Sequence, residues 1–249
     1  MEPAVIIEQP TLLSSLCVFF AAIVRGLTGF GFAAVSVVGL ILLMPLQQAV
    51  PLILCLEIAS SALLIGSAWR EADQPLLRRL LLAALLGVPC GLLLLSGSDP
   101  HWLTLGVYLL VGALALISLA RISLPLGRDP ISLGLVGGVS GALIATFSIG
   151  GPLLVACLSQ LRLSPVALRA TLILFFCVVD LAALAGLGLN GNVSWNTASQ
   201  AVFLLPALGL GLLLGQRLFR HIAPHTAALL TQWLLLTLAS LGLLGWWTS

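Results

Sequence analysis

Six uninterrupted apolar runs in the sequence are long enough to cross a bilayer, for which a helix needs roughly 20 residues. Polar and charged residues separate these runs from one another. Each run predicts one transmembrane helix, and the six cover residues 49–68, 76–97, 102–120, 166–189, 196–215 and 226–247. The pattern predicts an all-α polytopic membrane protein.

Two longer apolar runs, at residues 11–44 and 131–160, are interrupted near their middles. The first break lies in Gly26-Leu27-Thr28-Gly29-Phe30-Gly31, and the second in Ser148-Ile149-Gly150-Gly151-Pro152. Backbone that leaves the helix at membrane depth must be screened from lipid by protein or by a watery cavity. We therefore predict that each run is a broken helical hairpin and that the two breaks form a site.

Arginine is concentrated in some of the connections and missing from others. Short cytoplasmic loops retain Lys and Arg, so arginine-rich loops are assigned to the inside. The inside set is Arg70 with Arg78 and Arg79, Arg121 with Arg128, and Arg217 with Arg220; residues 98–101 and 190–195 carry no arginine and are assigned outside. Residue 130 then lies inside and residue 190 outside, so an odd number of membrane crossings must separate them. Two apolar runs lie between these residues, and one of them must therefore return to its own side. We predict that the broken run at 131–160 is re-entrant, returning to the side it entered, and the same reasoning applies to 11–44.

The two halves of the chain have the same order of elements. Residues 1–120 and 131–249 each combine one broken hairpin with three crossings, and the loop assignments place the second half upside down. The sequence therefore predicts two inverted repeats. A weak echo pairs Gly26 with Gly141, and another pairs Gly91 with Gly211. If each broken run instead crosses fully as two short helices, the loop orientations stay the same and only the depth changes.

Composition agrees with a chain that has lipid as its solvent. The 249 residues are 60% hydrophobic and 7% charged, with a mean hydropathy of +1.21, which a soluble fold of this size could not bury. The net charge of +2 lies mainly between the apolar runs, so no nucleic-acid-binding surface is predicted. All five cysteines fall within apolar runs and are expected to be buried small hydrophobes, neither disulfides nor metal ligands. No metal and no cofactor are predicted.

Paired breaks in inverted halves are typical of a binding site near the membrane midplane. Helix N-termini and free backbone amides at such a site suit a small anion. The residues expected to contact it supply positive charge, hydroxyl groups or closely approaching backbone, and they are Arg25, Thr28, Gly29, Phe30, Gly31, Ser148, Ile149, Gly150 and Gly151. The alternative is that these glycines only permit close helix packing.

Two carboxylates at membrane depth are candidates for carrying a coupling proton. Glu57 lies near the centre of run 49–68, and Asp180 lies well inside run 166–189. Charges at this depth are costly and are usually retained for function, and burial of a carboxylate favours its protonated form. The alternative for Arg25, Glu57 and Asp180 is a structural ion pair or a snorkelling side chain.

The two glycine-rich segments also carry a resemblance to a known family. With Gly26-Leu27-Thr28-Gly29-Phe30-Gly31-Phe32 early in the first half, and Gly141-Ala142 followed by Ser148-Ile149-Gly150-Gly151-Pro152 in the second, the sequence resembles the sulfite exporter TauE/SafE family over essentially its whole length. The first break has fewer consecutive glycines than is usual in the family. The resemblance implies a secondary transporter of sulfite, organosulfonates or related small organic anions in a bacterial inner membrane, with export as the expected direction. Arg25, Thr28, Ser148 and the backbone amides of the breaks would also suit a short carboxylate.

Two other functions compete with this one. An anion channel is an alternative, because inverted repeats with half-helices also build pores. Gly138-Val139-Ser140-Gly141 matches the short GxSG pattern of intramembrane serine proteases, whose nucleophile needs a general base. His221 and His225 are the candidate bases, but the neighbouring arginines place them near the cytoplasmic surface. We therefore predict no catalytic residue, and the sequence leaves a homo-oligomer open.

Overall fold

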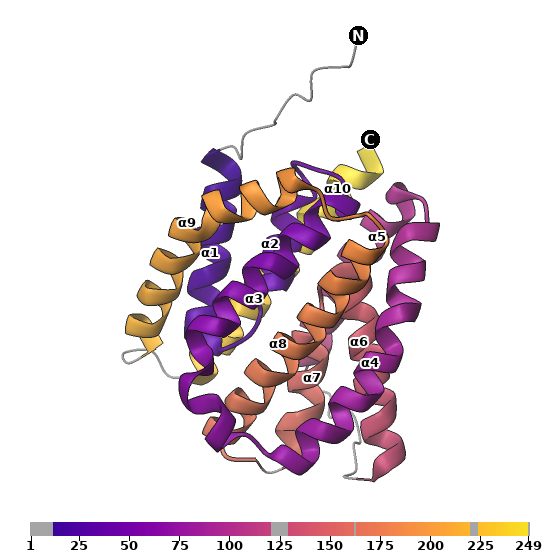
Figure 1. Cartoon of the computed structure of the whole chain (residues 1–249). Helices are drawn as coiled ribbons and strands as arrows, with labels where there is room; N and C mark the ends of the chain where they lie inside the picture. Colours follow the sequence, from indigo (N-terminus) through magenta and orange to yellow (C-terminus); the bar gives the residue numbers. More distant parts are fainter. Residues whose placement is uncertain (1–11, 121–128, 162, 220–223, 249) are drawn as a thin grey trace.

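The computed structural model consists of helices and short connections over the residues that it describes, which are 12–120, 129–161, 163–219 and 224–248 (Figure 1). In chain order the elements are α1 (Leu12–Thr28), α2 (Phe32–Leu40), α3 (Leu46–Glu71), α4 (Gln74–Gly97), α5 (Pro100–Leu119), α6 (Pro130–Phe147), α7 (Gly151–Leu158), the short 3-10 helix η1 (Ser159–Leu161), α8 (Pro165–Leu189), α9 (Trp195–Phe219) and α10 (Pro224–Thr248). Seven of the described helices are long and apolar enough to cross a membrane, namely α3, α4, α5, α6, α8, α9 and α10.

The predicted apolar runs coincide with helices, and the chain leaves the helix in both glycine-rich segments. Each of the six predicted crossings is one helix, extended by a few residues at one or both ends. The run 11–44 is divided between α1 and α2 at residues 29–31, and the run 131–160 between α6 and α7 at residues 148–150. The run 131–160 also contains a helix, α6, that is by itself long enough to span.

Four helices begin at a polar residue that caps the free backbone N–H groups of the first turn. The side chains of Asp73, Asp99, Asp129 and Ser164 accept hydrogen bonds from backbone N–H groups at the starts of α4, α5, α6 and α8. Proline follows each cap within two residues, where its missing N–H costs no helical hydrogen bond. At Asp129 the bond from Ser132 N–H lowers the pKa of the carboxyl group. These caps fix where the helices begin.

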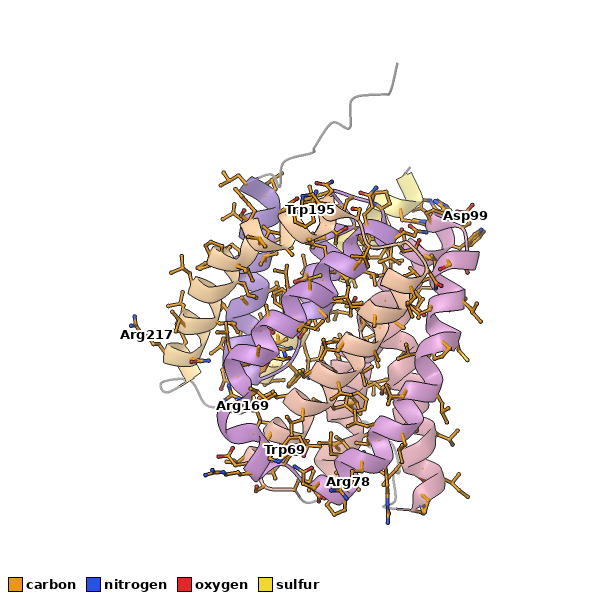
Figure 2. All side chains as sticks on the ribbon, viewed as in Figure 1. Trp69, Arg78, Asp99, Arg169, Trp195 and Arg217 are labelled. Atoms are coloured by element: carbon orange, nitrogen blue, oxygen red, sulfur yellow. The ribbon has the colours of Figure 1, made fainter. Side chains whose placement is uncertain are left out.

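Charged and aromatic residues mark the two ends of the bundle. Trp69, Arg78 and Arg169 lie toward the lower end in Figure 2, whereas Asp99 and Trp195 lie at the upper end. Tryptophan at helix ends is typical of residues at a membrane surface. Arg78 therefore lies at the opposite end of the bundle from Asp99 and Trp195, and which end faces the cytoplasm stays a prediction.

The outer surface of the bundle is apolar, as contact with lipid requires. On α4 the side chains of Leu82, Leu86 and Leu93 are exposed, whereas Leu80 and Ala84 on the opposite face are buried. The exposed leucines recur at intervals of four and seven residues, so one face of the helix is directed outward. All five cysteines are free thiols, but only Cys157 is buried as the sequence predicted; Cys17, Cys55 and Cys177 are half-buried, and Cys90 on this helix is exposed.

Helices α4 and α6 pack backbone against backbone. A Cβ atom added at Gly87 would collide with the carbonyl oxygen of Gly138, and one added at Gly91 with that of Ala142. The Thr146 hydroxyl group reaches across the contact and donates to the Gly91 carbonyl oxygen at 3.0 Å. Only glycine permits such an approach, and small residues are the usual means of close packing in membranes.

Helices α1 and α9 form a second contact of the same kind. A Cβ atom added at Gly211 would collide with the Phe19 carbonyl oxygen, and one added at Gly215 with that of Ile23. Helix α3 packs on α8, and α5 on α10. Each long helix of the first half therefore has its main partner in the second half.

Candidate functional site

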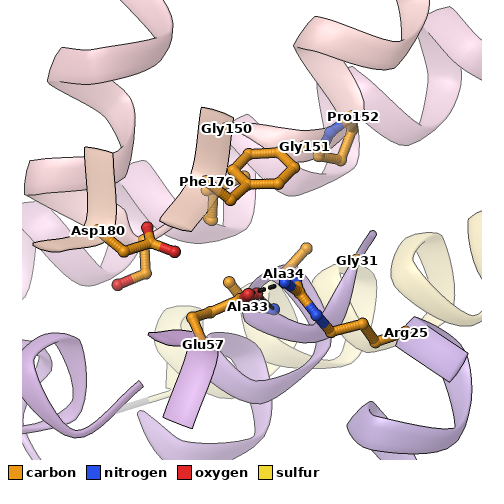
Figure 3. A pocket seen from close by; sticks show the side chains of 12 residues that line it. Arg25, Gly31, Ala33, Ala34, Glu57, Gly150, Gly151, Pro152, Phe176 and Asp180 are labelled. Carbon is orange, nitrogen blue, oxygen red and sulfur yellow. Dashed lines mark hydrogen bonds and ion pairs between the residues drawn. The ribbon is translucent and has the colours of Figure 1, made fainter. Parts of the chain in front are cut away.

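The two broken segments meet at a small buried cavity inside the bundle (Figure 3). The cavity has room for about one water molecule. Its walls come from both halves of the chain and consist of Arg25, Gly31, Ala33, Ala34, Glu57, Ser148, Ile149, Gly150, Gly151, Pro152, Phe176 and Asp180. Residues more than 100 positions apart in the sequence therefore share one enclosed space.

The first break is built from two glycines and a threonine. Gly29 and Gly31 have φ angles of +82° and +89°, in the left-handed region that side chains disfavour. The Thr28 hydroxyl oxygen lies 2.9 Å from the Val24 carbonyl oxygen and 2.6 Å from that of Phe30, and it accepts from Phe30 N–H at 3.3 Å. Thr28 therefore connects the end of α1 to the break and directs its hydroxyl group into the protein's own backbone.

The second break turns at Ser148, which has φ 57° and ψ 16°. It is the one residue other than glycine with positive φ among those the structure describes. Its N–H donates to the Ile144 carbonyl oxygen at 2.8 Å, which completes the last turn of α6. The Ser148 hydroxyl group is buried, lines the cavity and has no hydrogen-bond partner in the described part of the chain.

A buried ion pair crosses the first half of the site. Arg25 is 0% exposed and Glu57 is 4% exposed. Arg25 Nη1 pairs with Glu57 Oε2, and Arg25 Nη2 donates to Ser61 Oγ at 2.7 Å. The backbone N–H of Ala33, in the first turn of α2, donates to Glu57 Oε1 at 3.1 Å. One carboxylate on α3 thus joins the α1 guanidinium to the N-terminus of α2 (Figure 3).

Asp180 on α8 lies across the cavity from Glu57, with its carboxyl group directed toward the open space (Figure 3). It is 3% exposed, and its Oδ2 atom has no hydrogen-bond partner among the described residues. The same holds for Nε of Arg25. Because buried polar groups are nearly always paired, several unpaired ones around one cavity are typical of a site that takes up a polar ligand, water or a proton.

The structure brings most of the predicted site residues together. Arg25, Gly31 and residues 148–151 all line the cavity, as do Glu57 and Asp180. Their predicted roles in binding and in proton transfer remain predictions. Ala33 was missed by sequence reasoning, because it contributes a backbone N–H and its side chain carries no chemistry. The one indication of Ala33 in the sequence was its position two residues after Gly31, at the start of a new helix.

Three predicted residues do not line this cavity. The Thr28 hydroxyl group bonds the backbone of its own break, as described above. Gly29 faces the side chain of Arg169, because an added Cβ would lie 2.9 Å from Arg169 Cγ. Phe30 lines a neighbouring small cavity, together with Pro152 and Gln232. These residues shape the break, and the half-buried Arg169 packs beneath it.

The GxSG segment lies in the contact between α4 and α6. A Cβ atom added at Gly141 would collide with the backbone of Ala84, so this glycine serves helix packing. Ser140 is buried, and its hydroxyl group has no hydrogen-bond partner among the described residues. The predicted bases, His221 and the side chain of His225, lie outside the described part of the chain.

A family model of the sulfite exporter TauE/SafE type matches residues 14–243 of the 249 in the chain. The chain belongs to the sulfite exporter TauE/SafE family. The match includes both breaks and every helix that lines the cavity, so the resemblance noted in the sequence is confirmed. Comparison with curated proteins and with solved structures gave no match. Family membership and the seven apolar helices identify this TauE/SafE protein as a multi-pass membrane protein of a transporter family.

Proposed function

We propose that this protein is a proton-coupled secondary transporter that exports small anions, such as sulfite, organosulfonates or short carboxylates, across a bacterial inner membrane. The observation that carries the proposal is the meeting of two glycine-rich helix breaks around one buried guanidinium, that of Arg25. Helix N-termini at such breaks attract anions, because their free N–H groups and the helix dipole favour negative charge.

Inverted repeats are part of the proposal, with residues 1–120 as one and 131–249 as the other. The paired glycine contacts support them: Gly87 and Gly91 of α4 meet α6, and Gly211 and Gly215 of α9 meet α1 in the same spacing. These contacts favour a register that pairs Gly91 with Gly215, and not with Gly211 as the sequence echo suggested. On α6 the residues that meet α4 are Gly138 and Ala142, and they lie 119 positions after Phe19 and Ile23, the α1 residues that meet α9. The start of α7 lies 119 positions after the start of α2 as well.

A re-entrant path for the broken segments is also proposed. Helices α1 and α2 pack against each other, as do α6 and α7. In Figure 1 the chain enters α1 and enters α3 at the same end of the bundle, which is what a hairpin made of α1 and α2 requires. Two half-helices from opposite sides would then bring their breaks together near the midplane.

The charges around the cavity support coupling to protons. Arg25 contributes one positive charge, and Glu57 and Asp180 contribute two negative charges if both are ionised. An anion entering that arrangement would be repelled. One proton on either carboxyl group makes the wall neutral, so we expect proton uptake to accompany anion binding.

The size of the cavity supports alternating access over a continuous pore. Room for about one water molecule is too little for sulfite or a sulfonate. Binding therefore requires the breaks of α1–α2 and α6–α7 to move apart. We infer that the structure is a closed form and that opening to either side occurs by rocking of one half against the other.

The test is a flux assay in proteoliposomes with sulfite, small sulfonates and short carboxylates, with and without an imposed proton gradient. Arg25→Ala is compared with Arg217→Ala, which changes an exposed arginine on α9. We expect saturable, gradient-driven flux that is lost in Arg25→Ala and retained in Arg217→Ala. Equal flux in the two variants contradicts a role for Arg25 in the site, and no flux of any anion contradicts the function.

A further inference from the structure

The Glu57 carboxylate binds the two groups in the cavity that are best suited to hold an anion. Its Oε2 atom faces Arg25 Nη1, and its Oε1 atom accepts from Ala33 N–H at 3.1 Å. Helix α2 has nine residues, and Ala33, whose N–H makes this bond, lies in its first turn, where backbone N–H groups have no partner within the helix. A guanidinium and a helix N-terminus are the two protein groups best suited to an oxyanion. In this structure the protein's own carboxylate holds both.

We propose that Glu57 is a tethered competitor of the transported anion: the anion binds Arg25 and Ala33 N–H only after Glu57 has taken up a proton and withdrawn. This inference rests on the proposed function, the transport of an anion through this cavity. It assigns Glu57 a defined role, because the same donors are bound either by Glu57 or by substrate. Asp180 then serves as the neighbouring acceptor and not as the competitor.

Unpaired donors in the cavity indicate which anion fits. Arg25 Nε and the Ser148 hydroxyl group are both buried without a partner among the described residues, although Glu57 is in place. A carboxylate has two acceptor oxygens, and those of Glu57 are already used by Arg25 and Ala33. An anion with three oxygens on one centre could also accept from Arg25 Nε or Ser148. The geometry therefore favours a sulfonate or the hydrogen form of sulfite over a carboxylate.

The charges that face Glu57 determine how many protons are taken up with each anion. Arg25 on α1 and Asp180 on α8 line the same cavity, and Arg169 on α8 is close enough to Arg25 to repel its charge. Helices α2 and α7 contribute backbone and apolar side chains to the wall. When a proton converts the Glu57 carboxylate to a carboxylic acid, a monovalent anion can replace its charge beside Arg25. The exchange of one proton and one monoanion leaves the charge of the cavity unchanged.

Asp180 can accept a hydrogen bond from the Glu57 carboxyl group after that group has left Arg25. Its Oδ2 atom is buried, directed into the cavity and without a hydrogen-bond partner among the described residues. The O–H of protonated Glu57 can donate to it, so both groups are satisfied while the anion is bound. A buried polar group left without a partner would be destabilising. Asp180 therefore makes the withdrawn position of Glu57 accessible.

The test measures equilibrium binding of methanesulfonate and acetate to the purified full-length protein by calorimetry between pH 5 and pH 8. For the wild type, we expect the affinity for methanesulfonate to fall about tenfold for each pH unit above the midpoint of the Glu57 titration, since one proton is taken up with the anion. Glu57→Gln removes the competing charge and keeps the shape. This variant should bind methanesulfonate at pH 8 as tightly as the wild type does at pH 5, with no pH dependence. Acetate should bind at least tenfold more weakly than methanesulfonate to both proteins.

The control is Asp129→Asn, which changes an exposed carboxyl group at the start of α6 to a side chain that can also cap a helix, and it should keep the wild-type pH dependence. Glu57→Asp provides a second variant with an ionisable but shorter side chain. It should bind methanesulfonate more tightly than the wild type at pH 8 and still respond to pH. Weaker binding by Glu57→Gln at every pH, or an unchanged pH dependence, overturns the competition while leaving anion transport intact. Absence of binding and flux for the wild type would instead overturn the proposed function itself.

Discussion

The buried pair of Arg25 and Glu57 allows stability and transport to be separated in one set of variants. We consider Arg25→Met, Glu57→Leu and the double variant. Both side chains are at least 94% buried, so removal of one partner leaves the other charge uncompensated inside the protein. Loss of one member of a buried pair costs about 3–5 kcal/mol, whereas replacement of both by apolar residues is often neutral or stabilising.

The assay is thermal unfolding of the purified proteins in one detergent. For a chain of about this length, 1 kcal/mol shifts Tm by about 2–4 °C, so each single variant should lose at least ~6 °C. The double variant should lie within a few degrees of the wild type. Its flux should nevertheless be absent, because the guanidinium that faces the anion is gone. The loss in Arg25→Met should also be smaller at pH 5 than at pH 8, since a proton on Glu57 removes the uncompensated charge.

Two results would refute this reasoning. If the double variant is as unstable as the sum of the single variants, the two charges do not interact and the stability comes from other contacts. If the double variant is stable and transports anions as well as the wild type, the ion pair has no part in transport. A single variant that loses less than about 1 kcal/mol would mean that water reaches the pair, as for a surface salt bridge.

Three further predictions concern the fold. Gly141→Ala should destabilise the protein by about 1–3 kcal/mol in thermal unfolding, because the added carbon meets the backbone of α4. Gly134→Ala on the same helix, where nothing lies within 4 Å of the added carbon, should be neutral or stabilising. Equal effects of the two substitutions would contradict the close packing of α4 and α6. Ser148→Gly should raise stability by about 1–2 kcal/mol by relieving the left-handed conformation, whereas Ser148→Val should lower it; a lower Tm for the glycine variant would contradict this. In a cysteine-free background, an impermeant maleimide should label Asn192→Cys in intact cells and Arg78→Cys only after permeabilisation, and the reverse pattern would invert the predicted orientation.

The sequence by itself determined the helices and the two breaks, and it predicted the sidedness of the loops. Apolar runs of roughly 20 residues have few alternatives in a membrane, since an unpaired backbone is too costly there. The breaks were visible because glycines gather near the middle of each long apolar run, where a continuous helix does not need them. The structure gives the reason, since Gly29 and Gly31 adopt φ angles that side chains disfavour. The arginines of the loops were informative because their placement follows a rule that does not depend on packing.

Only the tertiary structure decided what the candidate site residues contact. Arg25 and Glu57 were both suspected, but they are 32 positions apart and lie on different helices, so their pairing depends on how α1 and α3 pack around α2. The Ala33 N–H has no signature in the sequence, because every residue except proline carries the same group. The Thr28 hydroxyl group, expected to face substrate, turned to its own backbone once the break had formed. Local composition determines which segments are helical and where they stop, whereas the direction in which a buried polar group points is determined by the partners that packing brings within reach.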